Sequence, residues 1–290
     1  MNYSKWLNDN VGELKDKTIL ITGSTGALGT ETVYGLAFLG ASLIFVDRNQ
    51  EKSNKLKTEL KEKFPNLNVS NYVADMSNIE SVKNVCNELK EKKVDVIILN
   101  AGAYKANSEK LGDYSSIFQI NFISPYLFAK NMLQNNPEAK VVVVGSLAHK
   151  FAKFNQKDID YLKNGSGFKI YGNSKRWLMY AIKKLCDKNG YKYSIVHPGI
   201  SLTNLMTGFP KFVYLLIKYP MRLVFMKPKK ACLSIVKGVT DETKGKFWIG
   251  PKIFGVWGTP RKTRLKIKDE ELELIFNNTE DIYNKNSPIS

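Results

Sequence analysis

The chain has 290 residues, of which 43% are hydrophobic, and a formal net charge of +17. This length and composition allow a substantial core, in one large α/β domain or in two small ones. The three cysteines, Cys86, Cys186 and Cys232, are widely separated, form no CxxC motif and share the chain with only two histidines. This excludes the usual structural zinc site, so we expect no bound metal and predict reduced, buried thiols.

Neither an N-terminal apolar signal segment nor a run of 18 uninterrupted apolar residues occurs in the sequence. Secretion and a membrane-spanning helix are therefore not expected, and the prediction is a cytoplasmic protein. The positive charge is unevenly spread, because residues 206–268 contain 15 Lys and Arg against two acidic residues, a local charge of +13. Such an excess suits an acidic partner, a membrane surface or nucleic acid, although a solvated face is the commoner explanation.

Apolar runs that read as strands alternate with helical patterns along the first 200 residues. After a short polar lead, the predicted strands are TILITG (18–23), ASLIFVD (41–47), NVSNYVAD (68–75), VDVIILN (94–100), KVVVVGS (140–146) and KYSIVHP (192–198). The first predicted helix follows residue 23 and the second ends at Phe64. Two more span about 77–92 and 114–133, and the last carries Tyr171 and ends at about Asp187. Beyond residue 200 we expect further helices, one short strand (KFWIG, 246–250) and a terminal helix from Asp269.

Near-continuous apolar strands that alternate with helices indicate a parallel sheet covered on both faces. Right-handed crossovers give a Rossmann-like doubly wound α/β fold, whose ligand crevice lies beyond the carboxyl ends of the strands. Repeats, low-complexity tracts and linkers are absent from the sequence. We therefore expect one domain over 1–290, with a core at 17–203, a basic apolar segment at 204–240 and a C-terminal extension at 241–290.

The first strand runs into a glycine-rich turn that opens a helix. Backbone N–H groups at such a turn, with the helix dipole, suit a pyrophosphate. The dinucleotide-binding candidates here are Gly23, Ser24, Thr25, Gly26, Leu28 and Gly29.

The next three strands also end in candidates for cofactor binding. Asp47 suits a ribose 2′-hydroxyl and Arg48 a 2′-phosphate, so these residues leave the choice of cofactor open. Asp75-Met76 would meet an adenine edge, and the small residues of Asn100-Ala101-Gly102 admit a ligand close to the backbone. Taken singly, each Asp or Asn is also explained as a cap on the following helix.

A Tyr and a Lys four residues apart share one face of a helix. Such a pair alone is weak evidence in a Lys-rich chain, where chance predicts roughly two and the sequence has four: Tyr126/Lys130, Tyr171/Lys175, Tyr180/Lys184 and Tyr214/Lys218. Only Tyr171/Lys175 follows a strand that ends in a serine, Ser146, and the helix before that strand carries Asn121. These four side chains, Asn121, Ser146, Tyr171 and Lys175, are the predicted catalytic group.

Taken together, the motifs resemble the short-chain dehydrogenase/reductase superfamily over residues 17–205. The stretch from Ser146-Leu147-Ala148-His149-Lys150 through Tyr171-x-x-x-Lys175 to His197-Pro198-Gly199 is most similar to its retinol-dehydrogenase-like branch. Ala27 replaces the family's usual middle glycine, and Leu99 replaces a common second Asn. The resemblance implies that Ser146 orients the substrate oxygen, Lys175 also holds the nicotinamide ribose and Asn121 positions a relay water. It further implies that Pro198, Gly199, Ile200 and Thr203 meet the nicotinamide.

Hydride transfer between a nicotinamide and a carbonyl or alcohol carbon requires a proton to move on or off the oxygen. A free phenol with a pKa near 10 is a poor base at neutral pH. We expect Lys175, with an oxidised nicotinamide, to lower the pKa of Tyr171 by stabilising the phenolate, which makes Tyr171 the general acid/base. Asp47 favours NAD(H) over NADP(H), because a carboxylate repels a 2′-phosphate, although Arg48 acts in the opposite sense.

The segment GFPKFVYLLIKYPMRLVFMKPKK (208–230) is long, aromatic and basic. The region after the Pro-Gly strand usually forms the substrate lid in the family, so its composition favours a bulky apolar, lipid-like substrate. Contact with a membrane interface, packing on the body and contact within a homo-oligomer are the alternatives.

An NAD(P)-dependent alcohol dehydrogenase or carbonyl reductase acting on a small molecule is the predicted function, and a non-catalytic dinucleotide-binding regulator of the same fold is the alternative. Nucleic-acid binding is disfavoured, because the basic cluster is mixed with bulky apolar residues and no nucleic-acid module is recognisable. A serine hydrolase is disfavoured because Ser146 lies in GSLAH, which is no Gly-x-Ser-x-Gly elbow.

Overall fold

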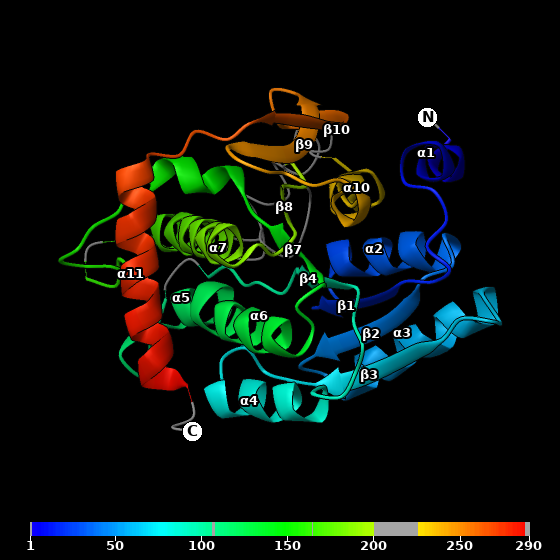
Figure 1. Cartoon of the computed structure of the whole chain (residues 1–290), viewed down its shortest axis with the longest axis horizontal. Helices are drawn as coiled ribbons and strands as arrows, with labels where there is room; N and C mark the ends of the chain where they lie inside the picture. The colour runs from blue at the N-terminus through cyan, green and yellow to red at the C-terminus, as the bar shows by residue number, and fades with distance from the viewer. Residues whose placement is uncertain (1, 106–107, 164, 200–225, 288–290) are drawn as a thin grey trace, which may run out of the picture.

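The computed structural model describes residues 2–105, 108–163, 165–199 and 226–287 (Figure 1). The strands are β1 (Thr18–Thr22), β2 (Ser42–Asp47), β3 (Val69–Val73), β4 (Val96–Leu99), β5 (Lys110–Leu111), β6 (Tyr114–Ser115), β7 (Lys140–Val144), β8 (Tyr193–Val196), β9 (Phe247–Ile253) and β10 (Trp257–Arg264). The helices are α1 (Tyr3–Asn10), α2 (Ala27–Phe38), α3 (Gln50–Lys63), α4 (Ile79–Glu88), α5 (Ser116–Phe118), α6 (Ser124–Asn135), α7 (Gly167–Asn189), α9 (Pro228–Ala231), α10 (Leu233–Thr240) and α11 (Asp269–Asn286), with a π-helix, η1 (Gln119–Ile123), and a 3₁₀-helix, η2 (Leu147–Phe151).

The main sheet has the strand order β10-β9-β8-β7-β4-β1-β2-β3. All its neighbours pair in parallel except β9 and β10, which form an antiparallel hairpin at one edge. The chain order reverses direction between β1 and β4, which is the switch point where doubly wound sheets bind ligands. The predicted doubly wound parallel sheet in a single domain is confirmed.

Successive residues of the central strands point to opposite faces of the sheet, and both faces are buried. On one face, Leu20, Ile97 and Val141 pack with α4, α6, α7 and α11. On the other face, Ile19, Val96 and Val142 pack with α1, α2, α3 and α10. Figure 1 shows these two helical layers on either side of the strands. Double burial explains why the strands read as continuous apolar runs rather than as alternating ones.

The long helix α7 is delimited by local signals in the sequence. Its N-cap Ser166 accepts a hydrogen bond from the backbone N–H of Lys169, and its C-cap Gly190 has a left-handed φ of +73°. These are the residues that helix ends favour, because a hydroxyl satisfies a free N–H and glycine tolerates positive φ. The cap fixes where α7 begins and therefore where Tyr171 and Lys175 lie relative to β7.

The C-terminal region differs from the prediction of one short strand. The structure has two strands there, and β10 was not predicted because WGTPRKTR shows no apolar alternation. Proline and exposed cations are typical of an edge strand, which has one unpaired side. The helix α1 was also not predicted, since its sequence is polar apart from the buried Trp6 and Leu7.

Several predicted features fall partly outside the described residues. The predicted lid segment, 204–240, is described only from residue 226, where α9 and α10 begin the layer that packs on α2, β7 and β8. The lid role and the domain boundaries stay predictions. Cys86, Cys186 and Cys232 are free and buried, as expected. Within the described part of the chain, no helix is both long and apolar enough to cross a bilayer.

Candidate active site

The glycine-rich turn joins β1 to α2 at the carboxyl edge of the sheet. Gly23 adopts φ +71°, and a Cβ at Gly29 would overlap the carbonyl oxygen of Gly23. Both positions therefore require glycine. The helix begins at Ala27, which is exposed, so its methyl group does not obstruct the packing of the turn. The first N–H groups of α2 are those that would hold a pyrophosphate.

Asn100, at the end of β4, holds this turn from the neighbouring strand. Its Nδ2 donates to the carbonyl oxygens of Thr22 and Gly23, at 3.0 and 2.9 Å. In return, the Thr22 hydroxyl accepts hydrogen bonds from the backbone N–H groups of Asn100 and Ala101, at 3.1 and 3.0 Å. Asn100 therefore acts as a clamp between β1 and β4, and the predicted residues Ala101 and Gly102 follow it along the crevice.

Asp47 ends β2 directly beneath the turn and is only 2% exposed. One oxygen, Oδ2, accepts from the hydroxyls of Ser24 and Ser53, at 2.5 and 3.0 Å. The other, Oδ1, accepts from the backbone N–H and the hydroxyl of Thr25, both at 3.2 Å. A carboxylate has about four acceptor positions, so the protein itself occupies all of them. The neighbouring Arg48 is exposed.

Asp75 and Met76 follow β3, as predicted. The Asp75 carboxylate accepts from the backbone N–H and the hydroxyl of Ser77, both at 2.8 Å, and so caps the turn that leads to α4. Met76 is buried, and its carbonyl oxygen accepts from the Ser124 hydroxyl at 2.7 Å. Both residues hold the rim of the crevice.

The catalytic candidates Ser146 and Tyr171 meet at the end of β7. The Ser146 hydroxyl lies close enough to the Tyr171 phenol to affect its pKa, and it caps η2 by accepting from the N–H of Ala148 at 3.2 Å. The Tyr171 ring packs edge-on against Tyr104, with 5.8 Å between the ring centroids. Tyr104 was not singled out from the sequence, although an aromatic residue two positions after Asn100-Ala101-Gly102 is the signal that could have found it.

Burial controls the ionisation of Tyr171 and Lys175 in this structure. Burial raises the pKa of Tyr171, and the nearby Ser146 hydroxyl only partly opposes that effect. Burial also lowers the pKa of Lys175, to about 8. Lys175 does not contribute to the shift of the Tyr171 pKa, and its ammonium donates to the carbonyl oxygen of Val144, at 3.0 Å. The raised pKa keeps the Tyr171 phenol protonated at neutral pH.

Asn121 lies in the π-helix η1, a local widening that often marks functional sites. Its Oδ1 accepts from the N–H of Ala103 at 2.7 Å, and its Nδ2 donates to the Ala103 carbonyl at 2.9 Å and the Ser174 hydroxyl at 3.1 Å. A Cβ at Gly102 would lie 3.1 Å from Asn121 Oδ1 and 3.2 Å from Lys175 Nζ. Asn121, Lys175 and the strand-end glycine therefore converge on one point.

The segment after β8 carries the remaining predicted contacts. Pro198 is buried, and the N–H of Gly199 donates to Nδ1 of His197 at 3.1 Å. Ile200 and Thr203 lie outside the described residues. His197 packs on Trp248, with 4.3 Å between ring centroids, and burial lowers its pKa to about 3. This histidine is a neutral packing residue of the strand end.

The remaining Tyr/Lys pairs have structural settings wherever they are described. Tyr126 and Lys130 both bind Glu280 of α11. Tyr180 lies on the opposite face of α7 from Tyr171, where its hydroxyl donates to the Lys266 carbonyl at 3.4 Å. Tyr214 and Lys218 lie outside the described residues. Strand context therefore separates Tyr171/Lys175 from the pairs that the structure describes.

A family model for short chain dehydrogenases matches residues 17–209. The chain belongs to the short chain dehydrogenase family. Within this family it is retinol-dehydrogenase-like. One curated relative is polyprenol dehydrogenase of Homo sapiens, which is 27% identical over 79% of this chain and 74% of the relative. Another is retinol dehydrogenase 14 of Homo sapiens, which is 28% identical over 73% of this chain and 69% of the relative.

Solved structures share the short chain dehydrogenase fold at low sequence identity. An uncharacterized protein from Mycobacterium paratuberculosis superposes with a TM-score of 0.74 and 20% identity, covering 94% of this chain and 95% of that one. A short chain dehydrogenase from Shigella flexneri, complexed with NADP, superposes with a TM-score of 0.61 and 16% identity over 80% and 93%.

The residues present fit the family's nicotinamide dinucleotide. The start of α2 carries the glycines that a pyrophosphate requires, and the Gly102 backbone leaves no side chain between Asn121 and Lys175. Family membership together with this cradle supports NAD(P)-dependent oxidoreductase activity.

Proposed function

We propose that this protein interconverts a carbonyl and an alcohol on a bulky apolar substrate, as an NAD(H)-dependent alcohol dehydrogenase or carbonyl reductase with Tyr171 as general acid/base. The observation that carries the proposal is the proximity of the Ser146 and Tyr171 hydroxyls, at the same edge of the sheet as the glycine-rich turn. Two hydroxyl groups that share one point can both reach a single substrate oxygen.

In carbonyl reduction the nicotinamide, when bound, supplies the hydride that the carbonyl carbon accepts. Ser146 donates a hydrogen bond to the carbonyl oxygen and fixes its position, and Tyr171 gives that oxygen its phenolic proton. The raised pKa of Tyr171 keeps the phenol protonated and ready for this step. The reverse reaction, alcohol oxidation, needs the phenolate, which a positively charged Lys175 would stabilise.

Asn121 and Lys175 support the return of the proton. Because both side chains line the point next to Gly102, we assign Asn121 the positioning of a water that passes a proton towards Tyr171 by way of Lys175. Lys175 would exchange its bond to the Val144 carbonyl for one to the nicotinamide ribose when the cofactor binds. Pro198, Gly199, Ile200 and Thr203 are assigned to the nicotinamide end.

The preference for NAD(H) rests on the charge of Asp47. Its four acceptor positions are filled by Ser24, Thr25 and Ser53, so a hydrogen bond to the ribose would have to displace one of them. Its negative charge still repels a 2′-phosphate across the turn, whereas the exposed Arg48 attracts one. NAD(H) is favoured because solvent screens the charge of the buried Asp47 less than that of the exposed Arg48.

The apolar substrate is inferred from composition and from the relatives. Two curated relatives are named for polyprenol and for retinol, and both names denote long apolar alcohols. The aromatic and basic composition of segment 208–230 is of the kind that such a molecule requires.

Cofactor fluorescence with a graded carbonyl panel tests this function. NADH is mixed with the protein and with short polar aldehydes, medium-chain ketones, steroids and prenyl aldehydes. We expect turnover, with kcat/KM rising as the apolar part of the substrate lengthens. Turnover of only the short polar aldehydes would overturn the apolar substrate, and NADH binding without turnover on any carbonyl would favour the regulatory alternative.

A further inference from the structure

The hairpin formed by β9 and β10 has an unusual turn at its tip. The N–H of Val256 donates to the Ile253 carbonyl at 2.9 Å, and the two residues between them, Phe254 and Gly255, have φ of +50° and +72°. Asn-Gly and Gly-Gly are the pairs that such a turn favours, and a bulky residue is rarely found in this conformation. The conformation of the turn therefore favours Asn or Gly, rather than phenylalanine, at position 254.

Core packing does not explain this phenylalanine either. The side chain of Phe254 is 94% exposed. Ile253 and Trp257, which face each other across the strands, are 53% and 40% exposed. Three large apolar side chains at one tip form a contiguous exposed patch, a feature that marks interaction sites.

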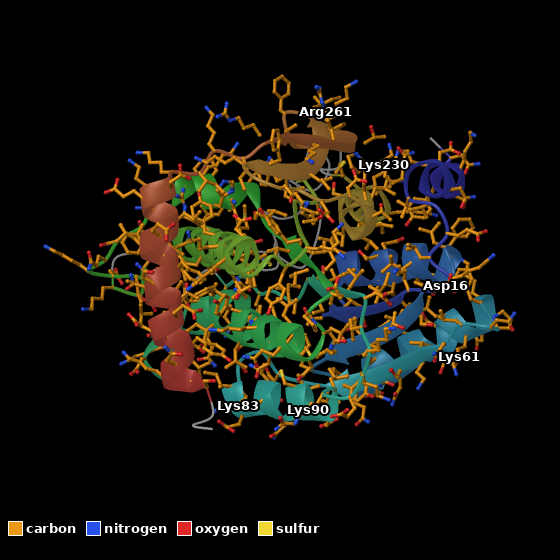
Figure 2. The ribbon with its side chains drawn as sticks, in the orientation of Figure 1. Asp16, Lys61, Lys83, Lys90, Lys230 and Arg261 are labelled. Carbon is orange, nitrogen blue, oxygen red and sulfur yellow. The ribbon has the colours of Figure 1, made fainter. Side chains whose placement is uncertain are left out.

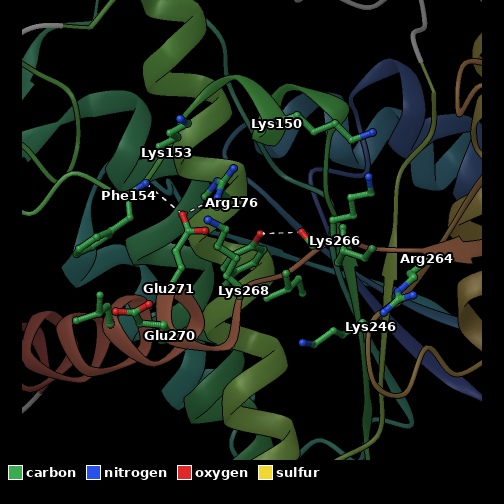
Figure 3. A pocket seen from close by; sticks show the side chains of 14 residues that line it. Lys150, Lys153, Phe154, Arg176, Lys246, Arg264, Lys266, Lys268, Glu270 and Glu271 are labelled. Atoms are coloured by element: carbon green, nitrogen blue, oxygen red, sulfur yellow. Dashed lines mark hydrogen bonds and ion pairs between the residues drawn. The ribbon is translucent and has the colours of Figure 1, made fainter.

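The charge around this tip has one sign. The sequence contains no Asp or Glu from Thr243 to Lys268 and eight Lys or Arg, and Lys252, Arg261, Lys262 and Arg264 of the hairpin are exposed. Figure 2 shows Arg261 on the outer side of the hairpin, which forms the upper edge of the molecule in this view. Lys252 directly precedes the tip and Arg261 lies opposite Gly250, whereas Arg264 at the base of the hairpin borders a cavity of about 720 Å³ that Lys246, Lys266 and Lys268 line together with Glu270 and Glu271 (Figure 3).

The tip also adjoins the candidate active site. Because β9 runs parallel to β8, its carboxyl end lies at the same edge of the sheet as Ser146. A Cβ at Gly255 would lie 3.5 Å from Leu147, the residue after Ser146, and one at Gly199 would lie 2.7 Å from the Val256 carbonyl oxygen. The exposed tip therefore stands beside the mouth of the crevice.

We propose that the β9–β10 hairpin docks the protein on a bilayer that contains anionic lipid, with Ile253, Phe254 and Trp257 inserted among the lipids and the hairpin cations on the headgroups. An apolar tip with cations on the strands behind it suits an interface that is apolar inside and negatively charged outside. Delivery of an apolar substrate from the bilayer to the crevice rests on the proposed function, whereas the docking does not.

Vesicle co-sedimentation of the full chain tests the docking. The vesicles are phosphatidylcholine alone or phosphatidylcholine with phosphatidylserine, and the protein is compared with Phe254→Asn. We expect the wild-type protein to bind the anionic vesicles. Phe254→Asn should weaken this binding by about tenfold or more, because it removes a phenylalanine that would be buried in the bilayer. The same variant should raise Tm by about 2 °C or more, because Asn suits the left-handed turn. Phe38→Ser, at another exposed phenylalanine on α2, should leave binding unchanged.

Several results would overturn the docking. One is that the wild-type protein remains in the supernatant with anionic vesicles. Another is that Phe254→Asn binds them as well as the wild type does, which would show that another segment makes the contact. A wild-type dimer that Phe254→Asn converts to a monomer, with no effect on vesicle binding, would make the tip a contact between copies. Turnover of a short soluble carbonyl without vesicles should be unchanged in Phe254→Asn, so loss of docking is distinguishable from failure of the proposed function.

Discussion

At the scale of single residues, Asp47 shows what a sequence motif reveals and what it leaves out. Its place at the end of the second strand was evident from the apolar run before it. Its hydrogen-bond partners were not, because Ser24 and Thr25 come from the glycine-rich turn and Ser53 comes from α3. Only tertiary packing brings these donors to one carboxylate, so Asp47 ties the turn to the sheet in addition to carrying charge.

The charge of Asp47 gives a testable cofactor preference. We expect kcat/KM with NADH to exceed kcat/KM with NADPH in the wild-type protein. Asp47→Asn should shift this ratio towards NADPH by about tenfold, because the repulsion of a 2′-phosphate is removed. Ser53→Ala removes one hydrogen bond but keeps the charge, so it should leave the ratio nearly unchanged. A wild-type preference for NADPH would show that Arg48, rather than Asp47, controls the choice.

At the scale of elements, a polar chain connects the C-terminal helix with the catalytic loop. Glu271 of α11 accepts from Nη1 of Arg176 at 2.5 Å. Arg176 of α7 donates through Nε and Nη2 to the His149 carbonyl, at 3.1 and 2.8 Å. His149 of η2 in turn meets the Ser146 carbonyl through Nδ1, at 2.7 Å. The chain extension after β10 therefore supports the loop that holds Ser146.

Removal of the Glu271 charge should cost the protein much of its stability. The ion pair is largely buried, with the Arg176 and Glu271 side chains 10% and 17% exposed. Glu271→Gln should lower the free energy of unfolding by about 3 kcal/mol, because the charge of Arg176 is left uncompensated. The matched control is Glu273→Gln on the same helix, whose pair with Lys184 is more exposed and should be worth less than about 1 kcal/mol. Equal losses in urea unfolding would contradict the support assigned to α11.

At the scale of the whole molecule, the sequence predicted those strands that are buried on both faces. The strands β1, β2, β4, β7 and β8 are buried on both faces, so their apolar runs predicted the sheet and placed Ser146, Asn100 and Asp47 at its carboxyl edge. The exposed, cationic β10 at the sheet edge carries no such pattern and was missed. The hydrogen bond from Lys175 to the Val144 carbonyl was also beyond prediction, because it depends on the rotamer of a long, flexible side chain.

The central claim, that Tyr171 gives and takes the proton, is tested most directly by single-turnover kinetics of Tyr171→Phe against Tyr180→Phe. Both tyrosines lie on α7, and Tyr171→Phe keeps the ring packed on Tyr104 while it removes only the hydroxyl. We predict that Tyr171→Phe binds NADH as the wild type does but reduces the carbonyl at least about 100-fold more slowly, whereas Tyr180→Phe reduces it at the wild-type rate. A Tyr171→Phe protein that keeps the wild-type rate of reduction would contradict this account.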